Sequence, residues 1–153
     1  MGIWVTPFTI TDLQARGVGT MVEHLGIAFT DIGEDFLSAK MPVDHRTKQP
    51  IGIMHGGASC VLAESVGSVA ANYCVNLSTH YCVGLEINTN HIRQATEGCV
   101  IGTAKPIHIG KRTQVWEIYI RHESGYLVSV NRLTMMVLDR EKLNSLSKPT
   151  VNQ

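Results

Sequence analysis

Glu64 is an isolated carboxylate in a segment that otherwise has no charge. Between Gln49 and Leu85 the chain contains no other Asp, Glu, Lys or Arg. Small and apolar residues surround it in the run MHGGASCVLAESVGSVAA, which begins at Met54 and predicts a helix. A carboxylate that is partly removed from water has a raised pKa. Glu64 is therefore suited to proton transfer or to attack on an electrophile.

The predicted helix start could supply hydrogen-bond donors to the group on which Glu64 acts. Gly56 and Gly57 would leave backbone N–H groups unpaired at the positive end of the helix dipole. Such donors can hold a carbonyl oxygen as it becomes an oxyanion. His55 and Gln49, just before the helix, can add a ring N–H and an amide donor. Together with Glu64, these residues predict a site that acts on a carbonyl group.

If Glu64 and the donors at the helix start act on the same carbonyl, their spacing requires two chains. Gly56 and Glu64 are eight residues apart, which corresponds to about 12 Å along a helix. One helix cannot apply both groups to the same carbonyl. We therefore expect two antiparallel copies of the helix across a two-fold axis, at least a homodimer. The small residues Gly67, Ala70 and Ala71 are expected to let the copies approach.

Other kinds of site find less support in the sequence. The seven histidines form no HExxH or Cys/His ligand pattern, so we expect no metal. There is no GxSxG elbow, GxGxxG or P-loop, and Cys60 has no basic neighbour in the helix to lower its pKa. Cations lie at two predicted turns, one with His91 and Arg93 and the other with Gly110, Lys111 and Arg112. These residues are either charges in contact with solvent or a group that could hold phosphates.

Composition limits the class of partner and the location. The chain has 13 basic and 13 acidic residues, so no basic field attracts nucleic acid or an anionic membrane. Neither a signal peptide nor a membrane span is evident. Cys60, Cys74, Cys82 and Cys99 show neither CxxC pairs nor dense spacing. They indicate reduced thiols, mostly buried, in a cytoplasmic protein.

The remaining pattern predicts one α+β domain, in which a long helix packs on a curved antiparallel sheet. Trp116, Ile118 and Ile120 alternate with polar residues, as in a strand with one buried face. We expect the domain to span residues 1–139, with a loosely ordered tail at 140–153. The predicted elements are two short helices (9–16 and 20–25), a hairpin (27–43), the helix (56–73) and a meander of about four strands (82–92, 99–109, 114–122 and 126–138).

Three motifs of this chain resemble one family, the hotdog-fold acyl-CoA thioesterases. They are QPxGxxHGGAS from Gln49, LAESxGS from Leu62 and VGLEIN from Val83. The resemblance covers about residues 3–138. It is strongest to the branch with 1,4-dihydroxy-2-naphthoyl-CoA thioesterase of menaquinone biosynthesis and the thioesterase that proofreads aryl carrier proteins. That branch is related to phenylacetyl-CoA and 4-hydroxybenzoyl-CoA thioesterases.

This resemblance implies roles for individual residues. It implies that Glu64 is the catalytic carboxylate, that Gln49, His55 and the Gly56 N–H surround the thioester carbonyl, and that Ser68 orients water or substrate. The implied assembly is a homodimer or homotetramer, with acyl-CoA as substrate, no cofactor, and an acyl or aryl carrier protein as a further partner. The substrate or CoA contacts that it implies are Gly84, His91, Arg93, Gly110, Lys111 and Arg112.

Two other functions are compatible with the same fold. A non-catalytic acyl-CoA binding or sensing module is one, although such modules usually lose the carboxylate that Glu64 supplies. A hydratase or dehydratase is the other, but it typically needs an Asp/His pair on a short helix that is not found here. Both a nucleophilic and a general-base role for Glu64 need an ionised carboxylate in the same place, and the sequence leaves them open.

Overall fold

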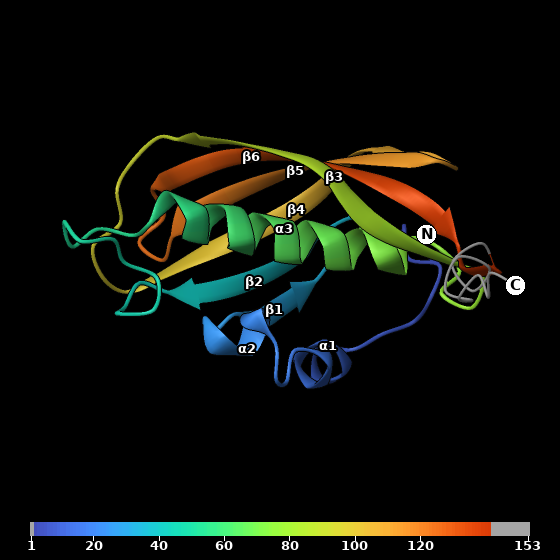
Figure 1. Ribbon diagram of the computed structural model, residues 1–153, viewed down its shortest axis with the longest axis horizontal. Helices are drawn as coiled ribbons and strands as arrows, with labels where there is room; N and C mark the ends of the chain where they lie inside the picture. Colours follow the sequence, from blue (N-terminus) through green and yellow to red (C-terminus); the bar gives the residue numbers. More distant parts are fainter. Residues whose placement is uncertain (1, 142–153) are drawn as a thin grey trace, which may run out of the picture.

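The computed structural model describes residues 2–141 and contains one antiparallel sheet that curves around a long helix (Figure 1). This arrangement confirms the predicted fold class. The elements are α1 (Ile10–Arg16), α2 (Met21–His24), β1 (Ala28–Ile32), β2 (Leu37–Pro42), α3 (Gly56–Tyr73), β3 (His80–His91), β4 (Cys99–Ile109), β5 (Thr113–His122) and β6 (Leu127–Asp139).

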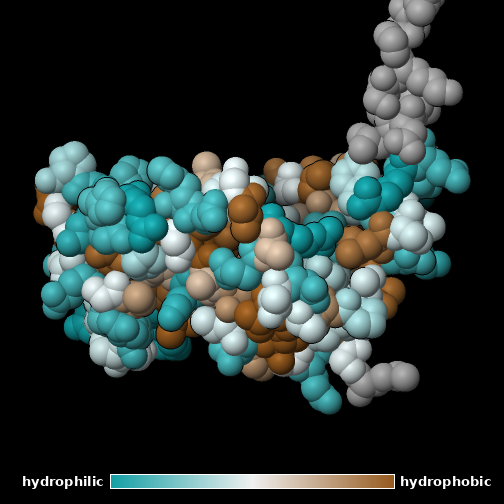
Figure 2. Space-filling view, turned by 90° about the horizontal axis from the view of Figure 1, so that it is seen from below, coloured by the Kyte–Doolittle hydropathy of each residue, from teal (hydrophilic) through white to brown (hydrophobic). Residues whose placement is uncertain are grey.

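Each of the two short helices begins with a threonine cap. Thr9 accepts a hydrogen bond from the N–H of Asp12, whose carboxylate accepts one from the Thr9 N–H, so α1 begins with a capping box. Thr20 caps α2 in a similar way. Both helices lie together at the β1 side of the sheet (Figure 1). Viewed from their side, hydrophobic residues lie in separate patches among hydrophilic ones (Figure 2).

Small residues allow α3 to pack closely against the sheet of the same chain. Gly67 is buried, and a Cβ atom there would lie 2.7 Å from Cδ2 of Leu133. Ala70 and Ala71 are likewise fully buried. The prediction that these three residues form a contact between two helices is therefore wrong. Their size lets the helix lie deep in the curved sheet, where larger side chains would push it outward.

The strand order is β1-β2-β4-β5-β6-β3, and neighbouring strands pair antiparallel. The predicted meander is correct for β4, β5 and β6 but wrong for β3, which pairs with β6 at the sheet edge. β4 is paired on both sides, with β2 and with β5, so α3 carries the chain across the sheet to the opposite edge, where β3 lies. Trp116, Ile118 and Ile120 of β5 are fully buried, as their alternation predicts.

The free edge of β3 is partly occupied by one side chain of α3. Oδ1 of Asn72 accepts a hydrogen bond from the Cys82 N–H at 2.9 Å, and its Nδ2 donates to the Cys82 carbonyl at 3.1 Å. The same Nδ2 donates to the Ser68 carbonyl at 2.9 Å. Asn72 therefore joins the second half of α3 to the edge strand.

Most of the predicted tail lies outside the described residues, so its loose order stays a prediction. Arg140, its first residue, donates a backbone hydrogen bond to Thr79 and a side-chain bond to the carbonyl of Leu77 at 2.7 Å. Its guanidinium also stacks on Tyr81. Within residues 2–141, no helix combines the length and the apolar character that crossing a membrane requires.

Candidate active site

His55 caps α3 with its own ring. Nδ1 of His55 accepts a hydrogen bond from the Gly57 N–H at 2.8 Å. A neutral imidazole that accepts at Nδ1 carries its proton at Nε2. The cap therefore fixes the tautomer and leaves the exposed edge of the ring as a donor. The Gly56 N–H forms no hydrogen bond to any residue in the 2–141 range, so a second donor remains free at the helix start.

A tight loop places Gln49 beside this helix start. The Gln49 N–H donates to the Ile53 carbonyl, and the Gly52 N–H donates back to the Gln49 carbonyl, both at 2.9 Å. Gly52 has a φ of +85°, a conformation that residues with a Cβ rarely adopt. The His55 N–H closes the loop by donating to the Thr47 carbonyl at 2.8 Å. Gln49 and His55 are therefore held by one set of backbone bonds.

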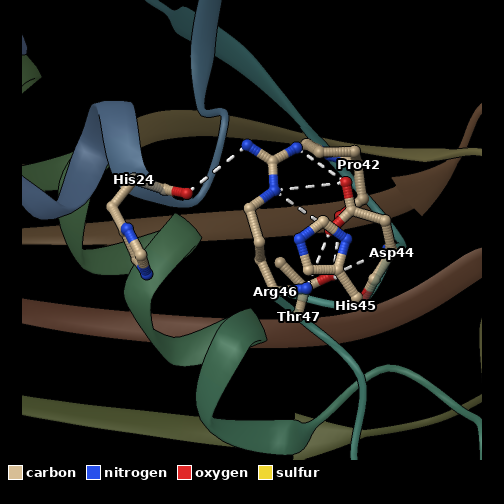
Figure 3. Close-up of polar contacts among 6 residues, drawn as sticks. All are labelled: His24, Pro42, Asp44, His45, Arg46 and Thr47. Atoms are coloured by element: carbon tan, nitrogen blue, oxygen red, sulfur yellow. Dashed lines mark hydrogen bonds and ion pairs between the residues drawn. The ribbon is translucent and has the colours of Figure 1, made fainter.

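A cluster of polar side chains fixes residues 44–47, which come just before the loop that carries Gln49 (Figure 3). Arg46 reaches both carboxylate oxygens of Asp44, with one bond of 2.6 Å, and its Nη1 donates to the His24 carbonyl. These bonds lower the pKa of Asp44 to about 2. Thr47 donates to the Pro42 carbonyl at 2.7 Å and accepts from the Asp44 N–H. The cluster ties the loop that carries Gln49 to the end of β2.

A cavity of about 280 Å³ opens at the start of α3, and we call it the start cavity. Gln49, Gly56, Ser59, His91 and Arg93 are among the residues that line it. The His91 ring lies against Gly56, where a Cβ atom would stand 2.8 Å from Nε2. Glycine at this position therefore leaves room for the ring. The structure thus brings two of the predicted CoA contacts, His91 and Arg93, to the predicted carbonyl donors.

Glu64 lies two turns further along α3, against the edge strand. A Cβ atom at Gly84 would collide with Oε1 of Glu64. β3 is also irregular here, because its pairing with β6 shifts between Gly84 and Glu86. The Glu64 side chain is half-buried, and desolvation raises the pKa of its carboxyl. Among residues 2–141, no cation forms an ion pair with it.

Ser68, one turn beyond Glu64, lines a second cavity of about 250 Å³. Leu13, Val69, Tyr73 and Leu77 give this second cavity apolar walls. Arg16 also lines it and donates to the Tyr73 hydroxyl at 2.7 Å. The second cavity lies between α1 and the second half of α3, whereas the start cavity lies at the beginning of α3.

The other predicted CoA contacts lie apart within one chain. Gly110 and Lys111 line a hollow beside Cys74 and Asn76, at the far end of α3 from His91 and Arg93. Arg112 lies nearby, with its carbonyl bonded to the Val137 N–H. Gly84 contacts Glu64. One chain therefore does not gather the predicted CoA residues into a single surface.

Sequence reasoning did not single out two residues of this region. Ser59 lies within the HGGAS motif, and its spacing of three, four and seven residues from Leu62, Ala63 and Val66 is a signal that could have placed it on the buried face of the helix. Asn72 is a polar amide near the end of a helix of small residues, a signal that could have drawn attention to it. Within residues 2–141, no group of three His, Cys, Asp or Glu side chains is arranged to hold a metal ion.

Comparison with known proteins identifies the family. The model of the Thioesterase superfamily matches residues 51–129, which include the helix start, Glu64 and Ser68. This chain belongs to the Thioesterase superfamily. It is 54% identical over 136 residues to 1,4-dihydroxy-2-naphthoyl-CoA hydrolase of Escherichia coli, a match that covers 89% of this chain and 99% of the relative.

Two further relatives agree with this assignment. Proofreading thioesterase EntH of Cronobacter sakazakii is 46% identical, over 89% of this chain and 98% of the relative. A crystal structure of a mutant thioesterase from Pseudomonas aeruginosa superimposes with a TM-score of 0.89 at 43% identity, over 90% of this chain and 99% of that one. The fold is therefore the hotdog fold, and the protein is a thioester hydrolase rather than a non-catalytic binding module.

Proposed function

We propose that this member of the Thioesterase superfamily hydrolyses an aromatic acyl-CoA, such as 1,4-dihydroxy-2-naphthoyl-CoA, to the free acid and CoA. Glu64 either attacks the thioester carbon itself, which gives an anhydride that water then hydrolyses, or takes a proton from the water that attacks this carbon. In both cases the C–S bond breaks and CoA leaves as the thiolate. Gln49, the Nε2–H of His55 and the Gly56 N–H polarise the carbonyl oxygen, and Ser68 orients water or substrate. The reaction needs no cofactor, because CoA is part of the substrate.

The half-buried Glu64 carboxylate carries this proposal. Its pKa is raised by desolvation, and the described residues offer it no ion pair. A carboxylate held in this way is a stronger base or nucleophile than a solvated one. Gly84 provides the space that it occupies. A charge with a purely structural role would be expected to have a cation beside it.

The proposed site is shared between two chains. Gly56 and Glu64 are separated by about 12 Å along α3, so the donors of one chain serve the carboxylate of the other. The edge position of β3 supports this arrangement, because an unpaired edge can add a second strand. A two-fold pair of β3 strands would set two copies of α3 antiparallel. A homodimer, or a homotetramer of two such dimers, is the proposed assembly.

The second cavity, which Ser68 lines, favours an aromatic acyl group as the substrate. Its walls include Val69, Tyr73 and Leu77, and Ser68, four residues after Glu64 on α3, also lines it. An aromatic ring buries much apolar area in such a space. Among the relatives, the names of 1,4-dihydroxy-2-naphthoyl-CoA hydrolase and of the proofreading thioesterase EntH favour this class. An acyl or aryl carrier protein is therefore a second proposed partner, and menaquinone biosynthesis in the cytoplasm is the proposed setting.

A panel of CoA thioesters tests the proposal. The panel contains aryl, short-chain and long-chain acyl groups, and the released thiol is the signal. We expect kcat/KM to be highest for the bicyclic and monocyclic aryl thioesters. A clear preference for long aliphatic chains would contradict the aromatic assignment, and no release from any thioester would contradict the hydrolase assignment itself.

A further inference from the structure

Ser59 has a buried hydroxyl for which the fold provides no partner. Its side chain is 0% exposed, and Oγ has no hydrogen-bond partner among the described residues. A serine within a helix commonly donates to the carbonyl four residues before it, which here belongs to His55. Ser59 does not do so. Unpaired buried hydroxyls are rare in native structures because they lose their bonds to water without replacement.

The position of this hydroxyl points to a ligand in the start cavity. Ser59 lines the start cavity together with Gly56 and Gln49. Residues three apart lie on one side of a helix, with Cβ positions about 5 to 6 Å apart. The Ser59 hydroxyl therefore stands one helical turn from the proposed oxyanion donor. No Asp or Glu of the described residues lines the cavity, so no anionic group competes for the hydroxyl.

The identity of the ligand follows from the substrate and rests on the proposed function. If the Gly56 N–H and Gln49 hold the thioester oxygen, the thiol arm must leave from the same place. In CoA and in carrier-protein arms alike, two methylenes follow the sulfur and an amide comes next. An amide presents both a donor and an acceptor, and a serine hydroxyl can pair with either.

We propose that the Ser59 hydroxyl binds the pantetheine amide nearest to the thioester sulfur. Ser59 is then a specificity-determining binding residue that separates thioesters of amide-bearing thiols from simple alkyl thioesters. The phosphates of CoA are a poor alternative for this hydroxyl, because they lie many bonds further from the sulfur. They would also require cations rather than one neutral, fully buried group.

Two thioesters with the same acyl group test this proposal. One is the N-acetylcysteamine thioester, which contains the amide, and the other is the butanethiol thioester, which lacks it. In Ser59→Ala we expect kcat/KM to fall about 3- to 10-fold for the first, the usual value of one neutral hydrogen bond. The value for the second stays at the wild-type level.

Ser38→Ala is the matched control. Ser38 is also a buried serine, but its hydroxyl pairs with Thr103 on the sheet, away from α3. Its loss should not change the preference between the two thioesters. Ser59→Ala removes an unpaired polar atom, so the fold is not expected to lose stability. An equal loss on both thioesters, or no loss on either, overturns the proposal.

Binding provides a readout that does not depend on hydrolysis. The ligands are the benzyl thioethers of N-acetylcysteamine and of butanethiol, which cannot be hydrolysed, and titration calorimetry measures their affinities. We expect Ser59→Ala to weaken only the amide-bearing thioether. Equal affinity of the two thioethers for the wild type overturns the proposal. If the wild type cleaves no thioester yet binds the amide thioether through Ser59, the proposed hydrolysis fails while this inference stands.

Discussion

The two parts of α3 that the proposed mechanism uses are built in opposite ways. At the helix start, hydrogen bonds fix the ring of His55 and the backbone of Gln49 before a substrate arrives. Around Glu64, the described residues provide no ion pair, and the half-buried carboxylate lies against Gly84 instead. Hydrogen bonds define where the carbonyl oxygen must lie. Desolvation makes the carboxylate reactive, which a network of donors would prevent.

The largest effect is expected from removing the charge of Glu64. Glu64→Gln keeps the shape of the side chain and abolishes both a nucleophilic and a general-base role. We expect kcat to fall about 10² to 10⁴-fold, the usual contribution of such a group. Steady-state release of CoA measures it, and an unchanged circular dichroism spectrum controls for the fold. A variant that keeps most of its wild-type turnover would contradict the role of Glu64.

Removal of the donors at the helix start should have the next largest effect. Gln49→Ala and His55→Asn are each expected to lower kcat about 10² to 10³-fold, the usual loss for one oxyanion donor. Asparagine is a favoured N-cap, so His55→Asn removes the ring donor while keeping the cap. The thermal midpoint of His55→Asn should therefore stay near that of the wild type. An increase in KM alone would make either residue a binding group.

A methyl group at Gly84 should displace the carboxylate of Glu64. Gly84 does not have a positive φ, so alanine is allowed there by the backbone and meets only the carboxylate of Glu64. Displacement of a reacting group by about 1 Å can cost about 10²-fold in rate, and we expect a loss of kcat of this size for Gly84→Ala. Leu85→Ala, at the exposed neighbouring position, is the control. Full activity of Gly84→Ala would mean that the carboxylate position is not critical.

Mixing two inactive variants tests whether His55 of one chain and Glu64 of the other chain serve the same site. Glu64→Gln and His55→Asn are combined and allowed to exchange subunits. About half of random dimers are mixed, and each has one site with both defects and one with none, so activity should rise to about a quarter of wild type. If exchange is demonstrated and activity does not return, both residues act within one chain.

The smallest expected effect is on stability. Glu64→Gln should be more stable than the wild type at neutral pH, although it is less active. Because desolvation raises the pKa of Glu64 in the folded protein, folding favours its protonated form. Its contribution to stability is complete below the pKa of the unfolded chain and is lost as the pH rises through the folded value. Glu64→Gln should therefore unfold at a higher temperature than the wild type at neutral pH. The difference should shrink as the pH falls through the raised pKa of the folded protein and should be lost below 4.5, the ordinary pKa of this group. Thermal scans across pH measure it.

Local signals were sufficient for most of the fold. Thr9 and Thr20 act as caps, and Trp116, Ile118 and Ile120 lie on one buried face. The place of β3 could not be predicted in this way, because strand order depends on where α3 carries the chain. Gly67 was assigned to the wrong surface for a related reason. A small residue permits close approach, but the sequence does not say to which neighbour.

The candidate site could be predicted where a residue type is unusual for its surroundings. Glu64 is conspicuous because its segment carries no other charge, and Gly56 and Gly57 mark a helix start. The cap that fixes the tautomer of His55 depends on a ring orientation that no pattern encodes. The same holds for Ser59, whose importance comes from a missing bond. Residue types indicate what chemistry is possible, whereas burial and partners decide which residues are available for it.

The pairing of Asn72 with Cys82 has a consequence for how this protein avoids aggregation. An unpaired edge strand is a template for uncontrolled sheet growth. The Asn72 amide offers Cys82 one acceptor and one donor, as the backbone of an added strand would. A foreign strand therefore finds the beginning of β3 already occupied. Any chain that extends the sheet must start beyond Cys82, so a side chain of α3 limits the registers in which strands can add.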